Sequence, residues 1–166
     1  MIEPAKIDLS IELLDKLAIE EIIYAEYAPP GAMGKEGGVM IYIITDGNLN
    51  CYETNIFKNE DIYNKAIDIL QRNQITSRYN DIINENGILK FYGGGMGNNV
   101  FIHKDVSLKI ANGYFIYTKN DTEYKIYSSV QGVFNHVAYA ILRAASTMQM
   151  RNRLKESRRL RDYLDN

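Results

Sequence analysis

The sequence predicts an α+β fold: a mainly antiparallel sheet of about six to seven strands, covered by helices and followed by a long C-terminal helix. Apolar residues recur at three- and four-residue steps near both ends of the chain, which is typical of amphipathic helices. Between residues 88 and 128, short apolar segments alternate with turn signals and no helical pattern separates them. This order disfavours a doubly wound parallel fold.

The first predicted helix covers about residues 11–27. Ser10 is its expected N-cap, and Pro29-Pro30 ends it because proline lacks the backbone N–H that a helix interior needs. Its apolar positions are Ile11, Leu14, Leu17, Ala18, Ile22 and Ala25. Glu20, Glu21 and Glu26 are therefore assigned to a solvated helix face rather than to acid–base chemistry or metal binding.

A β-hairpin and further helices are predicted next. Residues 39–45 are nearly all apolar, Asp46-Gly47 is a strong type I′ turn signal, and residues 49–53 form the second strand. Asn59 is the expected N-cap of a helix whose apolar face contains Ile62, Ala66, Ile67 and Leu70. A shorter helical piece follows through Tyr79, Ile82 and Ile83, closed by Asn86-Gly87.

Short strands are predicted at residues 88–92, 99–103, 106–111, 114–118 and 122–128, with a hairpin turn at Asn112-Gly113. Residues 128–131 fit a capping box, and a final helix is expected to extend to about Leu164. Its broad apolar face comprises Val133, Phe134, Val137, Ala138, Ile141, Leu142, Ala145 and Met148.

Length and composition fit one globular domain. The chain has 166 residues, of which 46% are hydrophobic and 24% charged, so we assign residues 1–150 to one domain and 151–166 to a basic helical extension. Cys51 is the only cysteine and the chain has two histidines, so neither a disulfide nor a metal site or cofactor is expected. The N-terminus lacks a leader pattern and no apolar run could span a membrane, which favours a cytoplasmic protein.

Glycine is concentrated in two segments, 31–38 and 93–99, each of which runs into an apolar strand. Ordering a cluster of glycines costs conformational entropy. Such a cluster therefore indicates that the backbone geometry or a bound ligand requires glycine there. One hypothesis is that the two segments lie at the same end of the sheet and frame a binding pocket. Its contacts would be Gly34, Lys35, Tyr92, Gly94, Gly95, Asn98 and Asn99. The alternative is that both are simple connectors; a phosphate-binding P-loop is excluded because Glu36 follows Lys35 and no helix follows the loop.

His103 stands at the end of a predicted strand and is the candidate general base. No Gly-x-Ser-x-Gly nucleophile motif accompanies it, and Cys51 lies inside a predicted strand, where a small core residue is the expected role. A structural histidine is therefore favoured over a catalytic one, both here and at His136. Enzymatic activity ranks last among the functional hypotheses.

Charge is distributed asymmetrically along the chain. Residues 1–142 contain 12 Lys and Arg against 18 Asp and Glu, whereas residues 143–166 contain 7 against 3. The basic extension supplies four candidate partner-binding residues, Arg151, Lys155, Arg158 and Arg159. The alternative is that these cations complement the helix dipole and keep the helix soluble.

These features favour a small cytoplasmic, non-catalytic protein-binding module. A toxin-neutralising or defence-related role would suit an acidic single domain of this kind. The alternative is a small-molecule or nucleotide sensor that binds an anion between the glycine segments. Nucleic acid is disfavoured except along the C-terminal tail, because residues 1–142, the acidic body of the protein, repel a polyanion. No membrane partner is expected, and the sequence leaves a homodimer open.

Overall fold

The computed structural model describes residues 1–28, 38–72, 87–93, 96–103, 105–109, 112–128, 152–159 and 161, with the backbone alone for 87–93 and 96–99. Among the described residues, helices and strands are mixed up to residue 72, and the elements between residues 87 and 126 are all strands. The elements are, in order, β1 (Ala5–Asp8), α1 (Ile11–Lys16), the 3₁₀ helix η1 (Ile19–Glu21), β2 (Tyr24–Tyr27), β3 (Gly38–Thr45), β4 (Asn48–Asn55), α2 (Glu60–Arg72), β5 (Gly87–Gly93), β6 (Met96–Ile102), β7 (Val106–Lys109), β8 (Tyr114–Lys119) and β9 (Thr122–Ile126).

The strands form two sheets. The larger has six strands in the order β1-β4-β3-β2-β6-β5, and the smaller has three in the order β7-β8-β9. All neighbouring strands are antiparallel except β1 and β4, which are parallel. The predicted α+β class and the mainly antiparallel pairing are confirmed. The prediction of one sheet was wrong, because the apolar face of the small sheet packs on the large sheet instead of extending it.

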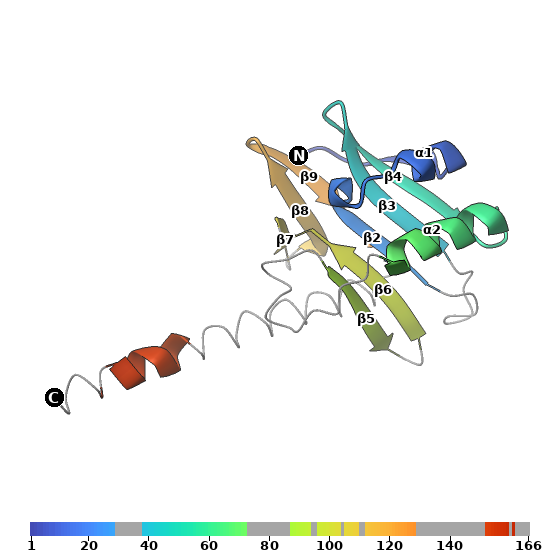
Figure 1. Cartoon of the computed structure of the whole chain (residues 1–166). Coiled ribbons are helices and arrows are strands. Elements are labelled where there is room, and N and C mark those ends of the chain that lie inside the picture. Colours follow the sequence, from blue (N-terminus) through green and yellow to red (C-terminus); the bar gives the residue numbers. More distant parts are fainter. Residues whose placement is uncertain are drawn as a thin grey trace.

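The large sheet is the middle layer (Figure 1). On one face it shares an apolar core with the small sheet, in which Tyr24 and Tyr42 meet Phe115 and Ile126. On its other face, Ala25 and Ile41 join a second core with α1 and α2. Alternate residues of a strand point to opposite faces, so two separate cores require strands that are apolar on both sides.

The predicted helix over residues 11–27 is wrong beyond Lys16. Ser10 does cap α1, since its hydroxyl accepts a hydrogen bond from the backbone N–H of Leu13 at 3.2 Å. Leu17, however, takes an extended conformation with ψ 114°, and residues 24–27 form the strand β2 between β3 and β6. Apolar residues on both faces of a buried strand satisfy the same short-range pattern as a helix, so tertiary pairing decided between them.

The turn and cap predictions are largely confirmed. Asp46 and Gly47 have φ of 52° and 77°, as a type I′ hairpin between β3 and β4 requires. Asn59 caps α2, accepting a hydrogen bond from the N–H of Ile62 at 3.1 Å through its side-chain oxygen. Gly113, with φ of 68°, lies in the predicted turn between β7 and β8.

The N-terminal segment contributes a strand that the sequence did not predict. β1 has only four residues, Ala-Lys-Ile-Asp, and all four are exposed, so its alternation of apolar and polar side chains is too short to predict a strand. Just before it, the backbone of Ile2 pairs with β9, donating to the carbonyl of Glu123 and accepting from the N–H of Lys125. The first eight residues therefore link the edges of the two sheets.

Two predicted helical regions lie outside the described residues. These are the short piece within 73–86 and the apolar face from Val133 to Met148. At the C-terminus the structure describes helical residues at 152–159 and 161, so the predicted long helix is not matched.

A pair of phenylalanines tests the two-sheet core. Phe115 is fully buried against Tyr24, whereas Phe57 is 73% exposed. We expect Phe115→Ala to lower the free energy of unfolding by about 3–5 kcal/mol, and Phe57→Ala to change it by about 0.5 kcal/mol or less. Urea denaturation of both variants provides the comparison, and equal effects would contradict the assignment of Phe115 to the core.

Candidate functional site

The strand ends that flank the two glycine segments lie at the same end of the large sheet. Tyr27, at the end of β2, pairs with Val39 near the start of β3 and with Asn99 of β6. The N–H of Ala28 continues this pairing, donating to the carbonyl of Gly38 at 3.0 Å. The β5–β6 hairpin extends beyond the same end (Figure 1). The register thus supports the predicted common location of the flanking strands.

The predicted contact residues are only partly placed. Gly34, Lys35, Gly94 and Gly95 lie outside the described residues, so their proposed joint site stays a prediction. The strands predicted at residues 88–92 and 99–103 extend further into the second glycine segment than expected. Gly93 and Met96 are paired, and Tyr92, Asn98 and Asn99 also occupy ladder positions.

Tyr27 is the most unusual side chain at this end of the sheet. It is buried, and its hydroxyl has no hydrogen-bond partner within the described part of the chain. Burial raises its pKa, so the hydroxyl stays protonated. A buried hydroxyl without a partner carries a desolvation cost, which a polar ligand could offset.

His103 has a structural environment. Its Nδ1 accepts a hydrogen bond from the backbone N–H of Asp105 at 3.1 Å, which closes the connection between β6 and β7. The ring meets Tyr117 edge-on, with centroids 5.3 Å apart. Because Nδ1 acts as an acceptor, a neutral ring carries its proton on Nε2. These contacts favour the structural interpretation of His103; His136 lies outside the described residues.

Glu26 was assigned wrongly to a solvated helix face. Glu20 and Glu21 are exposed, as predicted, but Glu26 belongs to β2 and is only 5% exposed. The hydroxyl of Tyr24, two residues earlier on the same strand face, donates a hydrogen bond to its Oε1. A buried carboxylate requires such donors, because an unpaired charge in the interior is strongly destabilising.

A network of polar groups accompanies Glu26 between the two sheets. The Tyr42 hydroxyl donates to the carbonyl of Tyr127 at 2.9 Å and accepts from the N–H of the same residue at 3.2 Å. Burial, and then the nearby Glu26, hold the pKa of Tyr24 well above its usual range. Burial likewise raises the pKa of the Cys51 thiol to about 12, so this cysteine is a protonated core residue, not a nucleophile. Of these contacts, the Tyr42 hydrogen bonds connect β3 of the large sheet to the residue that follows β9 of the small sheet.

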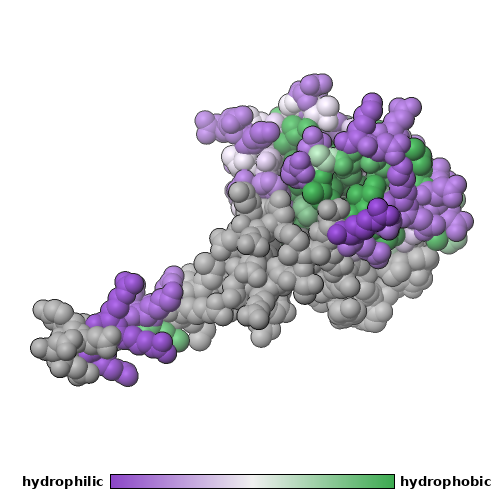
Figure 2. Space-filling model, in the orientation of Figure 1, coloured by the Kyte–Doolittle hydropathy of each residue, from purple (hydrophilic) through white to green (hydrophobic). Residues whose placement is uncertain are grey.

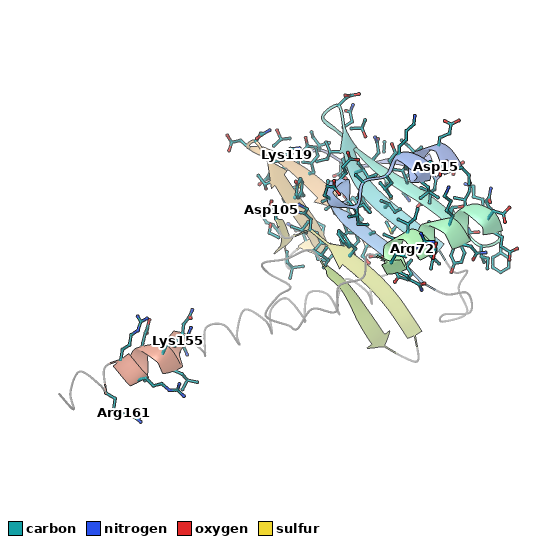
Figure 3. All side chains as sticks on the ribbon, in the orientation of Figure 1. Asp15, Arg72, Asp105, Lys119, Lys155 and Arg161 are labelled. Carbon is teal, nitrogen blue, oxygen red and sulfur yellow. The ribbon has the colours of Figure 1, made fainter. Side chains whose placement is uncertain are left out.

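The basic C-terminal helix is the most exposed candidate site. Every side chain at 152–159 is exposed, including Leu154, and the helix lies away from both sheets (Figure 1). Its surface is mainly hydrophilic (Figure 2), and Lys155 and Arg161 project from it (Figure 3). Arg151 lies outside the described residues.

Three cations of this helix lie on one face. Lys155, Arg158 and Arg159 are three and four residues apart, so they share one helix face. The ion pairs found in the described part of the chain all lie in the body, and none includes a cation of 152–161. Three of the four predicted partner-binding residues are therefore exposed together.

Comparisons with known proteins provide no relative for this chain: no family model, no curated protein and no solved structure matches it. Within the described ranges, no three His, Cys, Asp or Glu side chains are grouped as a metal site would require. Nor does any helix in those ranges have the length and apolarity needed to cross a bilayer.

The buried tyrosines predict a loss of stability at high pH. In the unfolded chain tyrosine ionises near its ordinary pKa of 10.0, whereas the pKa values of Tyr24 and Tyr42 are raised in the folded state. The unfolded state then binds fewer protons, so the free energy of unfolding falls as the pH rises above about 10. Each fully protected tyrosine contributes a slope of about 1.4 kcal/mol per pH unit.

Tyr42→Phe isolates one of these contributions. We expect the variant to be less stable at neutral pH by about 1 kcal/mol, because it loses the hydrogen bonds to Tyr127. Above about pH 10 its stability should decline less steeply than that of the wild type, by about 1.4 kcal/mol per pH unit. Urea denaturation from about pH 8 to about pH 11 measures both slopes, and identical slopes would contradict the burial of the Tyr42 hydroxyl.

Proposed function

We propose that this chain is a non-catalytic binding protein that docks on an acidic protein partner through its C-terminal helix. The observation that carries the proposal is the cationic face at Lys155, Arg158 and Arg159, which is exposed and without ion pairs in the described part of the chain. Surface cations that only confer solubility need not share a face, whereas docking benefits from a continuous one.

The contacts expected at such a surface combine charge with some apolar burial. Arginine forms bidentate hydrogen bonds with carboxylates, and its long stem also covers apolar surface. Leu154, which is 59% exposed, adds an apolar side chain to the same helix. Carboxylates arranged along a partner surface would therefore gain charge-assisted hydrogen bonds, and electrostatic attraction would increase the association rate.

An acidic protein fits this surface better than nucleic acid. Residues 1–142 carry a net charge of −6, which repels a polyanion that approaches the body. A protein partner can present a limited acidic patch to the helix alone. Nucleic acid is thus an alternative outcome of the experiment rather than part of the proposal.

Charge reversal tests the proposal. The triple variant Lys155→Glu, Arg158→Glu, Arg159→Glu is compared with a control that has the same net charge, Lys16→Glu, Lys109→Glu, Lys119→Glu, at exposed positions of the body. In affinity capture from the native host followed by quantitative mass spectrometry, an acidic protein should be retained by the wild type and the control. The helix variant should bind it at least about tenfold more weakly, with little change in stability.

Two results would contradict this proposal. One is equal loss of the captured protein in the helix variant and in the control, which would indicate a general charge effect. The other is tight binding of generic duplex DNA by the purified protein with a steep salt dependence, which would replace the protein partner by nucleic acid.

Tyr27 favours a second candidate function, a small-molecule sensor at the sheet end where the glycine segments attach. Its buried hydroxyl lacks a partner among the described residues, and its strand leads directly into the first glycine segment. A phosphate-bearing ligand could accept from Tyr27 while Lys35 and glycine amides neutralise its charge. Calorimetric titration with inorganic phosphate and with ATP should detect binding to the wild type, and Lys35→Ala should lower the affinity at least about tenfold. Absence of heat would rule out these ligands.

A further inference from the structure

β1 is the outermost strand at one edge of the large sheet among the strands that the structure describes. Among the described strands β1 pairs only with β4, and its four residues are exposed. Within the described ranges, Ile7 belongs to a small set of large hydrophobic side chains that are exposed, with 40% of its area accessible. An exposed edge presents unpaired backbone donors and acceptors on which another strand can assemble.

The free backbone groups of this edge belong to Lys6 and Asp8. The N–H of Leu9 donates to the carbonyl of Glu53 in β4 at 3.0 Å. Backbone groups of successive residues point to alternate sides of a strand, so Ala5 and Ile7 also face β4. The N–H and C=O of Lys6 and Asp8 consequently point away from the sheet.

A second copy of the chain complements this edge. In an antiparallel two-fold arrangement centred on Ile7, Lys6 of each copy stands opposite Asp8 of the other, and Ile7 stands opposite Ile7. The outward backbone groups then form the two hydrogen-bonded pairs, and Ile7 falls at the non-hydrogen-bonded pair between them, where side chains approach most closely. Each Lys6 also meets an opposite charge, since cross-strand neighbours lie on the same face.

We propose that two copies of this protein associate through β1, so that their large sheets join into one continuous sheet. Three features agree on the same register: the direction of the backbone groups, the exchange of opposite charges, and the mutual burial of Ile7. A shift of the pairing by one residue in either direction places Ile7 opposite Lys6 or Asp8 of the other copy. The backbone groups of Ile7 point inward to β4 and cannot form these hydrogen bonds, and Lys6 no longer stands opposite Asp8.

The association is expected to be weak and reversible. β1 has only four residues, and Pro4 before it has no N–H to extend the ladder. Short edge strands bearing lysine usually resist pairing, but here the lysine finds Asp8 of the other copy. Asp8 already pairs with Lys58, and its side chain is 74% exposed, so its carboxylate remains accessible to Lys6 of the other copy.

Charge reversal with mixing tests the register directly. Lys6→Asp places two acidic pairs in the homodimer and Asp8→Lys places two basic pairs, so each variant alone should associate at least about tenfold more weakly than the wild type. An equimolar mixture of the two variants restores opposite charges at both pairs and should associate like the wild type. Sedimentation velocity of the full-length protein over a concentration series measures all four samples.

Hydrogen exchange at low and high protein concentration tests which backbone N–H groups form hydrogen bonds between the two copies. The amides of Lys6 and Asp8 should become protected as concentration increases, whereas those of Ile7 and Leu9, which already face β4, should not change. The triple variant Lys155→Glu, Arg158→Glu, Arg159→Glu serves as a control and should associate like the wild type, which separates this inference from the function proposed for the C-terminal helix.

A protein that remains monomeric at millimolar concentration would overturn the inference. So would association that is unaffected by Lys6→Asp and Asp8→Lys, or a mixture of the two variants that fails to associate more strongly than either variant alone. Loss of association in the helix variant would assign the contact to the C-terminal helix instead.

Discussion

The burial of β2 in the middle of the large sheet is the constraint on which the rest of the structure depends. This four-residue strand pairs on both sides, with β3 and β6, and none of its residues is exposed. Tyr24 and Glu26 contribute to the layer against the small sheet, while Ala25 and Tyr27 contribute to the core beneath the helices. A change in β2 therefore affects both cores at once, because Tyr24 belongs to one of them and Ala25 and Tyr27 belong to the other.

The polar groups between the sheets follow from that position. Glu26 is tolerated in the interior because Tyr24 on the same strand face supplies a donor, and Tyr42 on the next strand holds both backbone groups of Tyr127. The Tyr42–Tyr127 hydrogen bonds fix the two sheets relative to each other more specifically than apolar packing alone can, since each has a defined direction. The polar groups between the sheets are thus used in internal hydrogen bonds, whereas those of the β1 edge and the C-terminal helix are exposed.

The candidate sites differed in how well the sequence revealed them. Charge is visible in a sequence, so the cations of the C-terminal helix were recognised, and the structure adds that Lys155, Arg158 and Arg159 are exposed. Two features were not recognisable: the burial of Glu26, and the lack of a partner for the Tyr27 hydroxyl among the residues that the structure describes. Both depend on strands distant in sequence. A β-prone Tyr-Ala-Glu-Tyr segment just before Pro29-Pro30 was the one available signal of a strand there.

By itself the sequence determined the features that depend on neighbouring residues: the Ser10 and Asn59 caps, the Asp46-Gly47 turn, the β7–β8 turn and the charge asymmetry. These depend on backbone conformations and side-chain hydrogen bonds within a few positions. Only the tertiary structure decided that residues 24–27 form a strand, that β1 joins the sheet, and that the strands divide between two sheets. Each of these depends on pairing between segments far apart in the chain, where the partner strand, rather than the local pattern of apolar residues, selects the conformation.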